Sequence, residues 1–436
     1  MTKDYLIAAL AQAIGVASAG TVTIVISRLL GPSGRGEYAV LSGLVQLLAM
    51  FGQAGFLAGA IQMGSRGTVP LGRLFRYAQI IPIVTGTLGS VALGLLLLLR
   101  PDALGHPPVS ACIVAIVLLP VLLASQMRAA LLLALQRPST YNKLFIVQQL
   151  VWVPCSTVAS AINPTSASAL AGLLVSAIVW LSASTWQLRR HVQPSPWSEL
   201  DMGELKRILT FGAQSTGGII LQLATSRVSL LIVSGAKGTV EAGIYSIATV
   251  LAEMLWQAVV AAAQVNLPRA SAAYGRGERP LTVMLASRVA GALTLGAALL
   301  LAAVAPVIIP IVFGPAFGPA VLPLRILLVG TGVFGLCLLL TADLLARGHP
   351  HMSAMASGIT LAITVPLCLM LVPRYGAAGA ASATCVAYLV STLTLVIVHR
   401  RMTGEHVSTL LMTTPGDVRV VVRAALRQVS HALGRD

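Results

Sequence analysis

The stretch Ser27-Arg-Leu-Leu-Gly-Pro-Ser-Gly-Arg-Gly-Glu-Tyr38 joins two long apolar segments near the start of the chain. Glycine or proline occupies positions 31, 32, 34 and 36, so the helix is expected to break and the chain to turn here. A related stretch follows in the second half, where Ser226-Arg227 precedes Gly235-Ala-Lys-Gly238 and Glu241-Ala-Gly-Ile-Tyr245. Both have Ser-Arg before a glycine-rich turn and Glu and Tyr after it. The chain is therefore predicted to contain two copies of one helical bundle.

The composition excludes a soluble protein. Hydrophobic residues make up 56% of the chain and charged residues only 10%, against about 25% in soluble domains. The formal net charge of +16 comes from basic residues that lie between apolar segments and form no single stripe. This placement is typical of the loops of a multi-pass membrane protein, so the expected partner is the lipid bilayer and not nucleic acid.

The predicted fold is all-α, because apolar segments of about 20 residues are long enough to cross a bilayer as helices. Twelve such segments are expected, and each half of the chain supplies six of them. They are 5–30, 38–61, 77–99, 110–135, 144–162, 166–188, 208–234, 242–265, 282–313, 321–346, 352–372 and 377–398. Pro306 and Pro310 are expected to kink the ninth segment or to end it early.

Basic residues predict the orientation. With the N-terminus in the cytoplasm, most lysines and arginines fall in the inner loops. The outer loops then hold only Arg35, Arg100, Lys237, Arg325 and Arg374. An even number of spans places both termini in the cytoplasm, and the first segment is expected to remain as a signal anchor.

Four regions are predicted along the chain. Residues 1–190 form an N-terminal six-helix lobe, 191–207 a cytoplasmic linker, 208–400 a C-terminal six-helix lobe, and 401–436 a cytoplasmic tail. Ser198 is expected to cap a short surface helix in the linker. The tail is expected to form an amphipathic helix from Asp417 on the inner leaflet. Because each copy has an even number of spans, the two lobes are predicted to be parallel repeats.

Four motifs resemble a known family. The first covers the turn residues Gly31, Pro32, Gly34, Arg35, Gly36, Glu37 and Tyr38. The others are Glu241-Ala-Gly-Ile-Tyr-Ser-Ile-Ala, Leu267-Pro-Arg and Pro373-Arg-Tyr-Gly-Ala-Ala-Gly-Ala-Ala. Together they are similar to the polysaccharide-export and O-antigen flippases, a branch of the multidrug/oligosaccharidyl-lipid/polysaccharide (MOP) exporter superfamily.

The resemblance implies two six-helix lobes around a central cavity, in the cytoplasmic membrane of a bacterium. It also implies a flippase that moves a lipid-linked oligosaccharide from the inner to the outer leaflet by alternating access. The implied partners are this lipid-linked substrate, a polysaccharide polymerase and glycosyltransferases.

No catalytic, cofactor-binding or metal-binding motif is present in the sequence. The phosphate loop Gly-x-x-x-x-Gly-Lys-Ser/Thr, His-Glu-x-x-His and Gly-x-Ser-x-Gly are all missing. The five cysteines lie inside apolar segments without metal-ligand spacing. A transporter that is not an enzyme and needs no cofactor is therefore expected.

Ionisable and amide side chains inside apolar segments are the candidate substrate-binding residues, because their burial in a membrane is costly. They are Arg28, Arg128, Arg227, Glu253, Gln12 and Gln222. Arg28 and Arg227 are expected to occupy equivalent places in the two copies and to bind an anionic head group. Alternatively, Arg227 pairs with Glu253, while Arg28 and Asp343 reach the membrane interface.

Three other functions fit parts of the pattern. A lipid II flippase of peptidoglycan synthesis would have a more basic cavity and often extra helices. A drug/cation antiporter of the same superfamily would need acidic residues deep in the first six segments, where the sequence has none. A membrane polymerase or glycosyltransferase would need larger loops outside the membrane.

Overall fold

The computed structural model describes residues 2–53, 55–99, 101–276, 281–349 and 351–404, and all regular elements in them are helical. The α-helices are α1 (Thr2–Gln53), α2 (Phe56–Ser65), α3 (Leu71–Leu99), α4 (Val109–Ala134), α5 (Pro138–Ile162), α6 (Ser166–Arg189), α7 (Met202–Gly275), α8 (Leu281–Phe313), α9 (Val321–Ala346) and α10 (His351–Thr403). Short 3-10 helices are η1 (Pro101–Leu104), η2 (Trp197–Glu199) and η3 (Pro315–Ala320).

Twelve apolar segments are present in these residues, as predicted. Nine described helices are long and apolar enough to cross a membrane. Three of them, α1, α7 and α10, contain a glycine with non-helical backbone, at Gly31, Gly238 and Gly376. Each of these three therefore supplies two segments, and the total agrees with the expected twelve. The protein is a multi-pass membrane protein, in which helices satisfy their own backbone hydrogen bonds within the lipid.

One local expectation is wrong, and another is reduced to one of its two alternatives. The second predicted segment, 38–61, is interrupted at Gly55, whose φ of 82° begins the separate helix α2. Pro306 and Pro310 lie inside α8, which continues to Phe313, so the ninth segment does not end early, and the alternative of a kink stays a prediction. A helix in lipid tolerates proline because neighbouring groups can satisfy the freed carbonyls.

The chain forms two compact units. The first comprises Met1–Ser246 with Ile311–Phe317, and the second Ile247–Pro310 with Gly318–Asp436. The first part of α7 belongs to the first unit because it packs closely on α2, where Gly212 lies against the Gly55 backbone. The functional lobes at 1–190 and 208–400 remain a prediction. The predicted amphipathic helix from Asp417 lies outside the described residues.

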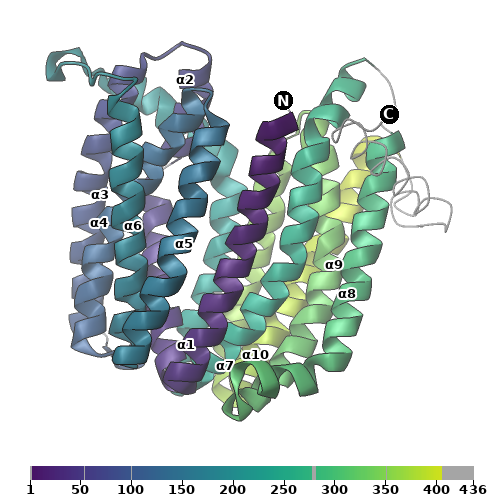
Figure 1. The fold of residues 1–436 in the computed structure, drawn as a ribbon. Coiled ribbons are helices and arrows are strands. Elements are labelled where there is room, and N and C mark those ends of the chain that lie inside the picture. Colours follow the sequence, from purple (N-terminus) through teal and green to yellow (C-terminus); the bar gives the residue numbers. More distant parts are fainter. Residues whose placement is uncertain (1, 54, 100, 277–280, 350, 405–436) are drawn as a thin grey trace. The chain divides into compact units, whose positions relative to one another are not determined.

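In the first unit, α3, α4, α5 and α6 run side by side (Figure 1). Helix α6 packs against both α4 and α5, and α1 packs against α5. Small residues permit these contacts, since a Cβ at Gly172 of α6 would overlap Ser156 of α5. Close approach through small residues is the usual way in which helices associate in membranes.

The linker is fastened to the start of α3. The Tyr77 hydroxyl donates to the Asp201 carbonyl oxygen at 2.9 Å, and Arg73 pairs with Glu204 at 2.9 Å. Arg76 donates to the Ser195 carbonyl oxygen at 3.0 Å. The expected cap at Ser198 is wrong, because η2 has no side-chain cap.

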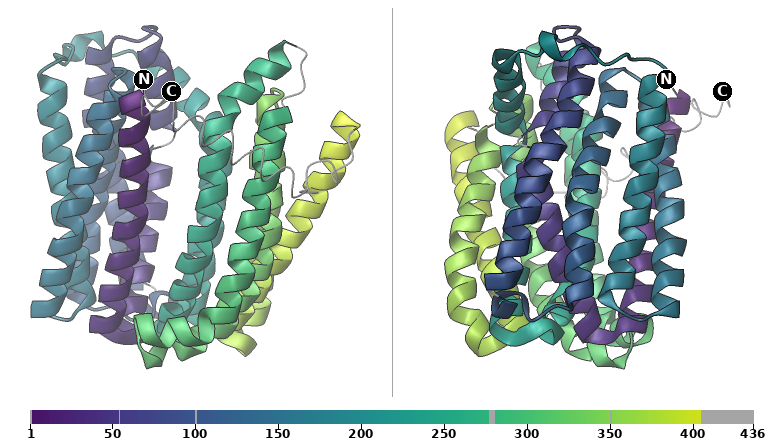
Figure 2. Two further views of the ribbon diagram at one scale, coloured as in Figure 1. Left: turned by 45° about the vertical axis from the view of Figure 1, so that its right-hand side comes forward. Right: turned by 90° about the vertical axis from the view of Figure 1, so that its left-hand side faces the viewer.

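In the second unit, α9 lies along α10 (Figure 2). Phe334 of α9 stacks on Tyr388 of α10 with ring centroids 4.1 Å apart. The Ser391 hydroxyl donates to the Ala356 carbonyl oxygen at 2.8 Å, which joins the two segments of α10. Among the described residues of this unit, α9 and α10 therefore share a buried hydrophobic cluster.

Candidate functional site

The two hairpins that the sequence singled out cross each other within the first unit. A Cβ at Gly36 would overlap the Thr239 carbonyl oxygen, and a Cβ at Gly243 would overlap the Pro32 carbonyl oxygen. Ser33 and Thr239 are also hydrogen-bonded at 3.0 Å. Glycine is required at both positions because backbone lies directly against backbone. We call this contact of Gly36, Gly243, Pro32 and Thr239 the glycine crossing.

The two hairpins of the glycine crossing have nearly the same backbone geometry. This likeness shows which residues of the two predicted copies correspond to each other. Gly31 has φ 65° and ψ −174°, and Gly238 has φ 84° and ψ 178°. The same number of residues separates Gly31 from Gly238 as separates Tyr38 from Tyr245. In this register Arg28 lies just before its glycine, whereas Arg227 lies about two helical turns earlier than the corresponding position. The expected equivalence of Arg28 and Arg227 is therefore wrong.

Arg227 projects from α7 onto the second segment of α1. Its Nη2 donates to Gln46 Oε1 at 3.1 Å, and its Nη1 lies 3.4 Å from the Ser226 hydroxyl. Gly43 makes room for the side chain, since a Cβ there would lie only 3.0 Å from Arg227 Cδ. The Arg227 Nε is buried without a hydrogen-bond partner.

Arg35 lies on the same segment of α1 and is only 4% exposed. Its guanidinium group lies 5.4 Å from the ring centroid of Tyr38, which gives a cation–π contact. Its Nε is also buried without a hydrogen-bond partner. Arg35 lies about two helical turns before Gly43, the glycine against which the Arg227 side chain packs. We call these two arginines, with Tyr38 and Gln46, the arginine site.

No carboxylate in the described part of the first unit pairs with either arginine. Glu37, the nearest acid in sequence to Arg35, instead accepts a hydrogen bond of 2.6 Å from Ser166 at the N-terminus of α6. That helix end carries partial positive charge, which suits the carboxylate. Arg35 is buried and Arg227 is half-buried, and a cation without a counter-ion in such a place is costly, so the arginine site is chemically suited to an anion.

Arg28 has a different role. Its Nε donates to the Val312 carbonyl oxygen at 2.7 Å, and its Nη2 donates to the Ile311 carbonyl oxygen. These carbonyls belong to the last turn of α8, where the carbonyl oxygens have no N–H donors from the helix itself. Arg28 therefore caps α8, and its placement is consistent with a structural role.

The other predicted residues are dispersed. Arg128 of α4 donates to the Thr185 hydroxyl of α6 at 2.9 Å. Gln12 is exposed, while Gln222 and Glu253 are half-buried and engaged in polar interactions. Only Arg227 among the six predicted residues is part of the arginine site.

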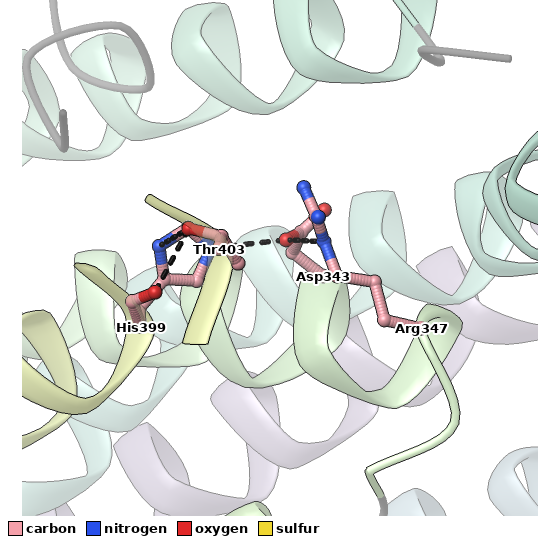
Figure 3. Close-up of polar contacts among 4 residues, drawn as sticks. All are labelled: Asp343, Arg347, His399 and Thr403. Atoms are coloured by element: carbon pink, nitrogen blue, oxygen red, sulfur yellow. Dashed lines mark hydrogen bonds and ion pairs between the residues drawn. The ribbon is translucent and has the colours of Figure 1, made fainter. Parts of the chain in front are cut away.

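Asp343 belongs to a partly buried polar cluster in the second unit (Figure 3). Its Oδ2 accepts from Arg347 Nε at 2.8 Å and from His399 Nε2 at 3.0 Å. Because a carboxylate only accepts, His399 carries its proton on Nε2. The other ring nitrogen lies 3.4 Å from the Thr403 hydroxyl. The cluster joins α9 to α10, and the suggestion that Asp343 reaches the membrane interface stays a prediction.

We expect His399→Leu to lower the free energy of unfolding by about 1.5–3 kcal/mol, because a hydrogen bond to the partly buried Asp343 carboxylate is lost. The His399 side chain is fully buried, so water cannot take its place as the hydrogen-bond donor to Asp343. The measurement is the thermal unfolding temperature of the purified protein in detergent. His351→Leu is the control because that residue is exposed and should change little. Equal unfolding temperatures for His399→Leu and the unchanged protein would contradict the prediction.

Arg35 is the residue that sequence reasoning missed. It was assigned to the turn and to an outer loop, where a basic residue is normally solvated. The only signal in the sequence was its position among Gly34, Gly36 and Tyr38, which permits close packing. Its burial depends on the distant hairpin of α7 that crosses over it.

The fold and the arginine site define a multi-pass membrane protein with a buried anion-binding candidate. The family described as polysaccharide biosynthesis protein matches residues 25–322, which is more than half of the chain. The chain belongs to this family. A comparison of the sequence with curated proteins finds no match.

Solved structures share the fold. The lipid II flippase MurJ in an inward closed conformation has a TM-score of 0.70 and 12% identity, over 98% of this chain and 93% of that chain. An outward-facing multidrug resistance MATE transporter of the MOP superfamily has a TM-score of 0.64 and 15% identity, over 94% of this chain and 96% of that chain. A MOP superfamily transporter from Pyrococcus furiosus has a TM-score of 0.57 and 15% identity, over 95% of this chain and 96% of that chain. These likenesses and the family match confirm the resemblance to the MOP superfamily.

Proposed function

We propose that this protein is a flippase for a polyprenyl-pyrophosphate-linked oligosaccharide in the cytoplasmic membrane of a bacterium. It would move this lipid from the inner to the outer leaflet for the synthesis of a cell-surface polysaccharide. The polyprenyl tail would stay in the bilayer while the charged sugar head crosses between two lobes. Glycosyltransferases would supply the substrate, and a polysaccharide polymerase would consume it.

The arginine site is the observation that carries this proposal. Arg35 is buried and Arg227 half-buried in the first unit, and among the residues described there no carboxylate pairs with either guanidinium group. A pyrophosphate has several charged oxygens that can accept from two guanidinium groups at once. Family membership supports the same substrate class, since the matched family is described by polysaccharide biosynthesis.

The rival functions differ in the charge of the substrate. A drug/cation antiporter should offer carboxylates to its cargo. In the described first unit, Glu37 is bonded to Ser166 and Glu204 is paired with Arg73. A lipid II flippase would carry the same pyrophosphate chemistry, so only a direct comparison of lipids separates it from our proposal.

A liposome assay tests the function. The purified protein is reconstituted with a fluorescent polyprenyl-pyrophosphate oligosaccharide, with fluorescent lipid II or with a fluorescent lipophilic cation. We expect the first lipid to become accessible to a membrane-impermeant quencher in protein-containing liposomes only. Faster movement of lipid II would favour the peptidoglycan alternative. Transport of the cation without movement of either lipid would overturn the proposal.

We also expect both termini to be cytoplasmic. In a background without the native cysteines, Lys237→Cys should react in whole cells with a thiol reagent that cannot cross the membrane, and Ser198→Cys should not. Both positions are exposed, so accessibility is decided by the side of the membrane. The basic residues motivate this topology. Labelling of position 198 from outside would refute it.

A further inference from the structure

One face of α5 carries five polar side chains at helical spacing. They are Gln148, Gln149, Trp152, Ser156 and Ser160. At about 100° per residue, they cover roughly a third of the circumference of the helix. We call this face, together with Trp180 of α6, the α5 seam.

The polar atoms of the α5 seam are buried and unpaired. Gln148 and Gln149 are each 7% exposed, and Ser156 and Ser160 are almost fully buried. The two amide oxygens and the two hydroxyls lack hydrogen-bond partners among the described residues. The indole N–H groups of Trp152 and Trp180 also lack partners there. Native proteins rarely leave so many polar groups unsatisfied, and each one costs stability.

Aromatic rings line the same region. The Trp180 ring lies 6.1 Å from the Tyr141 ring and 5.8 Å from the Phe145 ring, between centroids. Gly15 of α1 lies against Phe145, and Gly172 of α6 lies against Ser156. The α5 seam therefore faces α1 and α6, within the first unit.

The unpaired atoms indicate the class of ligand. Amide oxygens accept hydrogen bonds, indole N–H groups donate them, and hydroxyls do both. An anion would need donors only, and a cation would need acceptors only. A neutral ligand with many hydroxyls can satisfy both kinds, and the C–H face of a pyranose ring packs against aromatic rings.

We propose that the α5 seam binds the uncharged sugar units of the transported lipid while the arginine site holds its phosphates. This inference rests on the proposed function and deepens it. The helices must part slightly for the sugar to enter, and the unpaired groups lower the cost of that separation. Replacing the amides by leucine would then stabilise the empty protein while weakening sugar binding, which is the trade-off seen at many functional sites.

The test uses the full chain in lipid nanodiscs. Maltose, cellobiose, lactose and chitobiose are titrated separately, with tryptophan fluorescence and thermal stability as readouts. At least one disaccharide should give a saturable change. Gln148→Leu with Gln149→Leu should weaken that response by about tenfold or more, because two hydrogen bonds are lost. Trp186→Phe is the control, because Trp186 is exposed and stacks on Arg190 outside the α5 seam.

Inorganic pyrophosphate separates this inference from the proposed function. Pyrophosphate should raise the thermal unfolding temperature only when Arg227 is present. This effect should persist in the variant that carries Gln148→Leu and Gln149→Leu. Ser156→Ala with Ser160→Ala removes two hydroxyls with little change of shape and provides a second variant should the leucine variant fail to fold. No response to any disaccharide, or an unchanged response in the variant that folds, would overturn the sugar assignment. Loss of the pyrophosphate effect alone would count against the arginine site and leave the sugar assignment standing.

Discussion

Arg227→Ala is expected to abolish or strongly reduce polysaccharide export while the protein still inserts into the membrane. The substitution removes the guanidinium group that bonds Gln46 and leaves Arg35 as the remaining cation of the arginine site. A hydrogen bond to a charged group contributes about 1.5–3 kcal/mol, which corresponds to about 10- to 150-fold in binding. The measurement is polymer at the cell surface in a strain that lacks the chromosomal gene, together with the amount of protein in the membrane fraction.

Arg227→Lys should restore export only in part, because an ammonium group cannot make the two parallel bonds of a guanidinium group. Arg35→Ala should resemble Arg227→Ala. Arg128→Ala is the matched control, since Arg128 bonds Thr185 away from the arginine site.

The competing account makes Arg227 a partner that only neutralises Glu253. In that account, Arg227→Ala combined with Glu253→Gln would restore export, because no buried charge would be left unpaired. Full restoration in the double variant would remove Arg227 from the substrate site. Continued loss of export, with normal membrane insertion, would support an anion-binding role.

The helical architecture could be predicted from the sequence because lipid imposes a simple rule. Each span needs its own apolar run, and glycine or proline marks where a run ends. Gly31, Gly238 and Gly376 lie between predicted segments and all have positive φ. The break at Gly55 was not foreseen, because its cause is the close approach of Gly212 from α7. A contact between backbone segments that are far apart in the chain cannot be recognised from the residues around either segment.

The candidate site was less accessible to sequence reasoning. Arg227 was recognised because an arginine inside an apolar segment is unusual. Arg35 looked like a loop residue, and the polar face of α5 looked like ordinary helix contact. What identifies them is burial without a partner, which depends on tertiary contacts with α7, α1 and α6. Arg28 illustrates the converse, since its charge is used to cap the last turn of α8.

Gly243→Ala is expected to cause a large loss of folded protein. Overpacking a core costs about 1–3 kcal/mol when side chains can adjust. Here the new methyl group would meet the Pro32 carbonyl oxygen, and backbone cannot move aside without separating the hairpins. We therefore expect a loss at or above the upper end of that range. The readout is the fraction of monodisperse protein in detergent and its thermal unfolding temperature.

Gly217→Ala on the same helix is the matched control. No atom lies within 4 Å of a Cβ placed there, so alanine should be neutral or slightly stabilising. A similar loss for both variants would mean that α7 is sensitive to alanine in general and would refute the role of the crossing.

Gly36→Ala tests the symmetry of the glycine crossing. Its methyl group would meet the Thr239 carbonyl oxygen, so its effect should match that of Gly243→Ala. The added methyl groups would each lie close to the other glycine's backbone nitrogen, at 2.9 Å and 3.1 Å. One substitution therefore already separates the hairpins, and the double variant should lose less than the sum of the single losses. Fully additive losses would indicate two independent contacts. Because Arg35 directly precedes Gly36, any variant that separates the hairpins without unfolding the chain should also expose the arginine site and weaken its response to pyrophosphate.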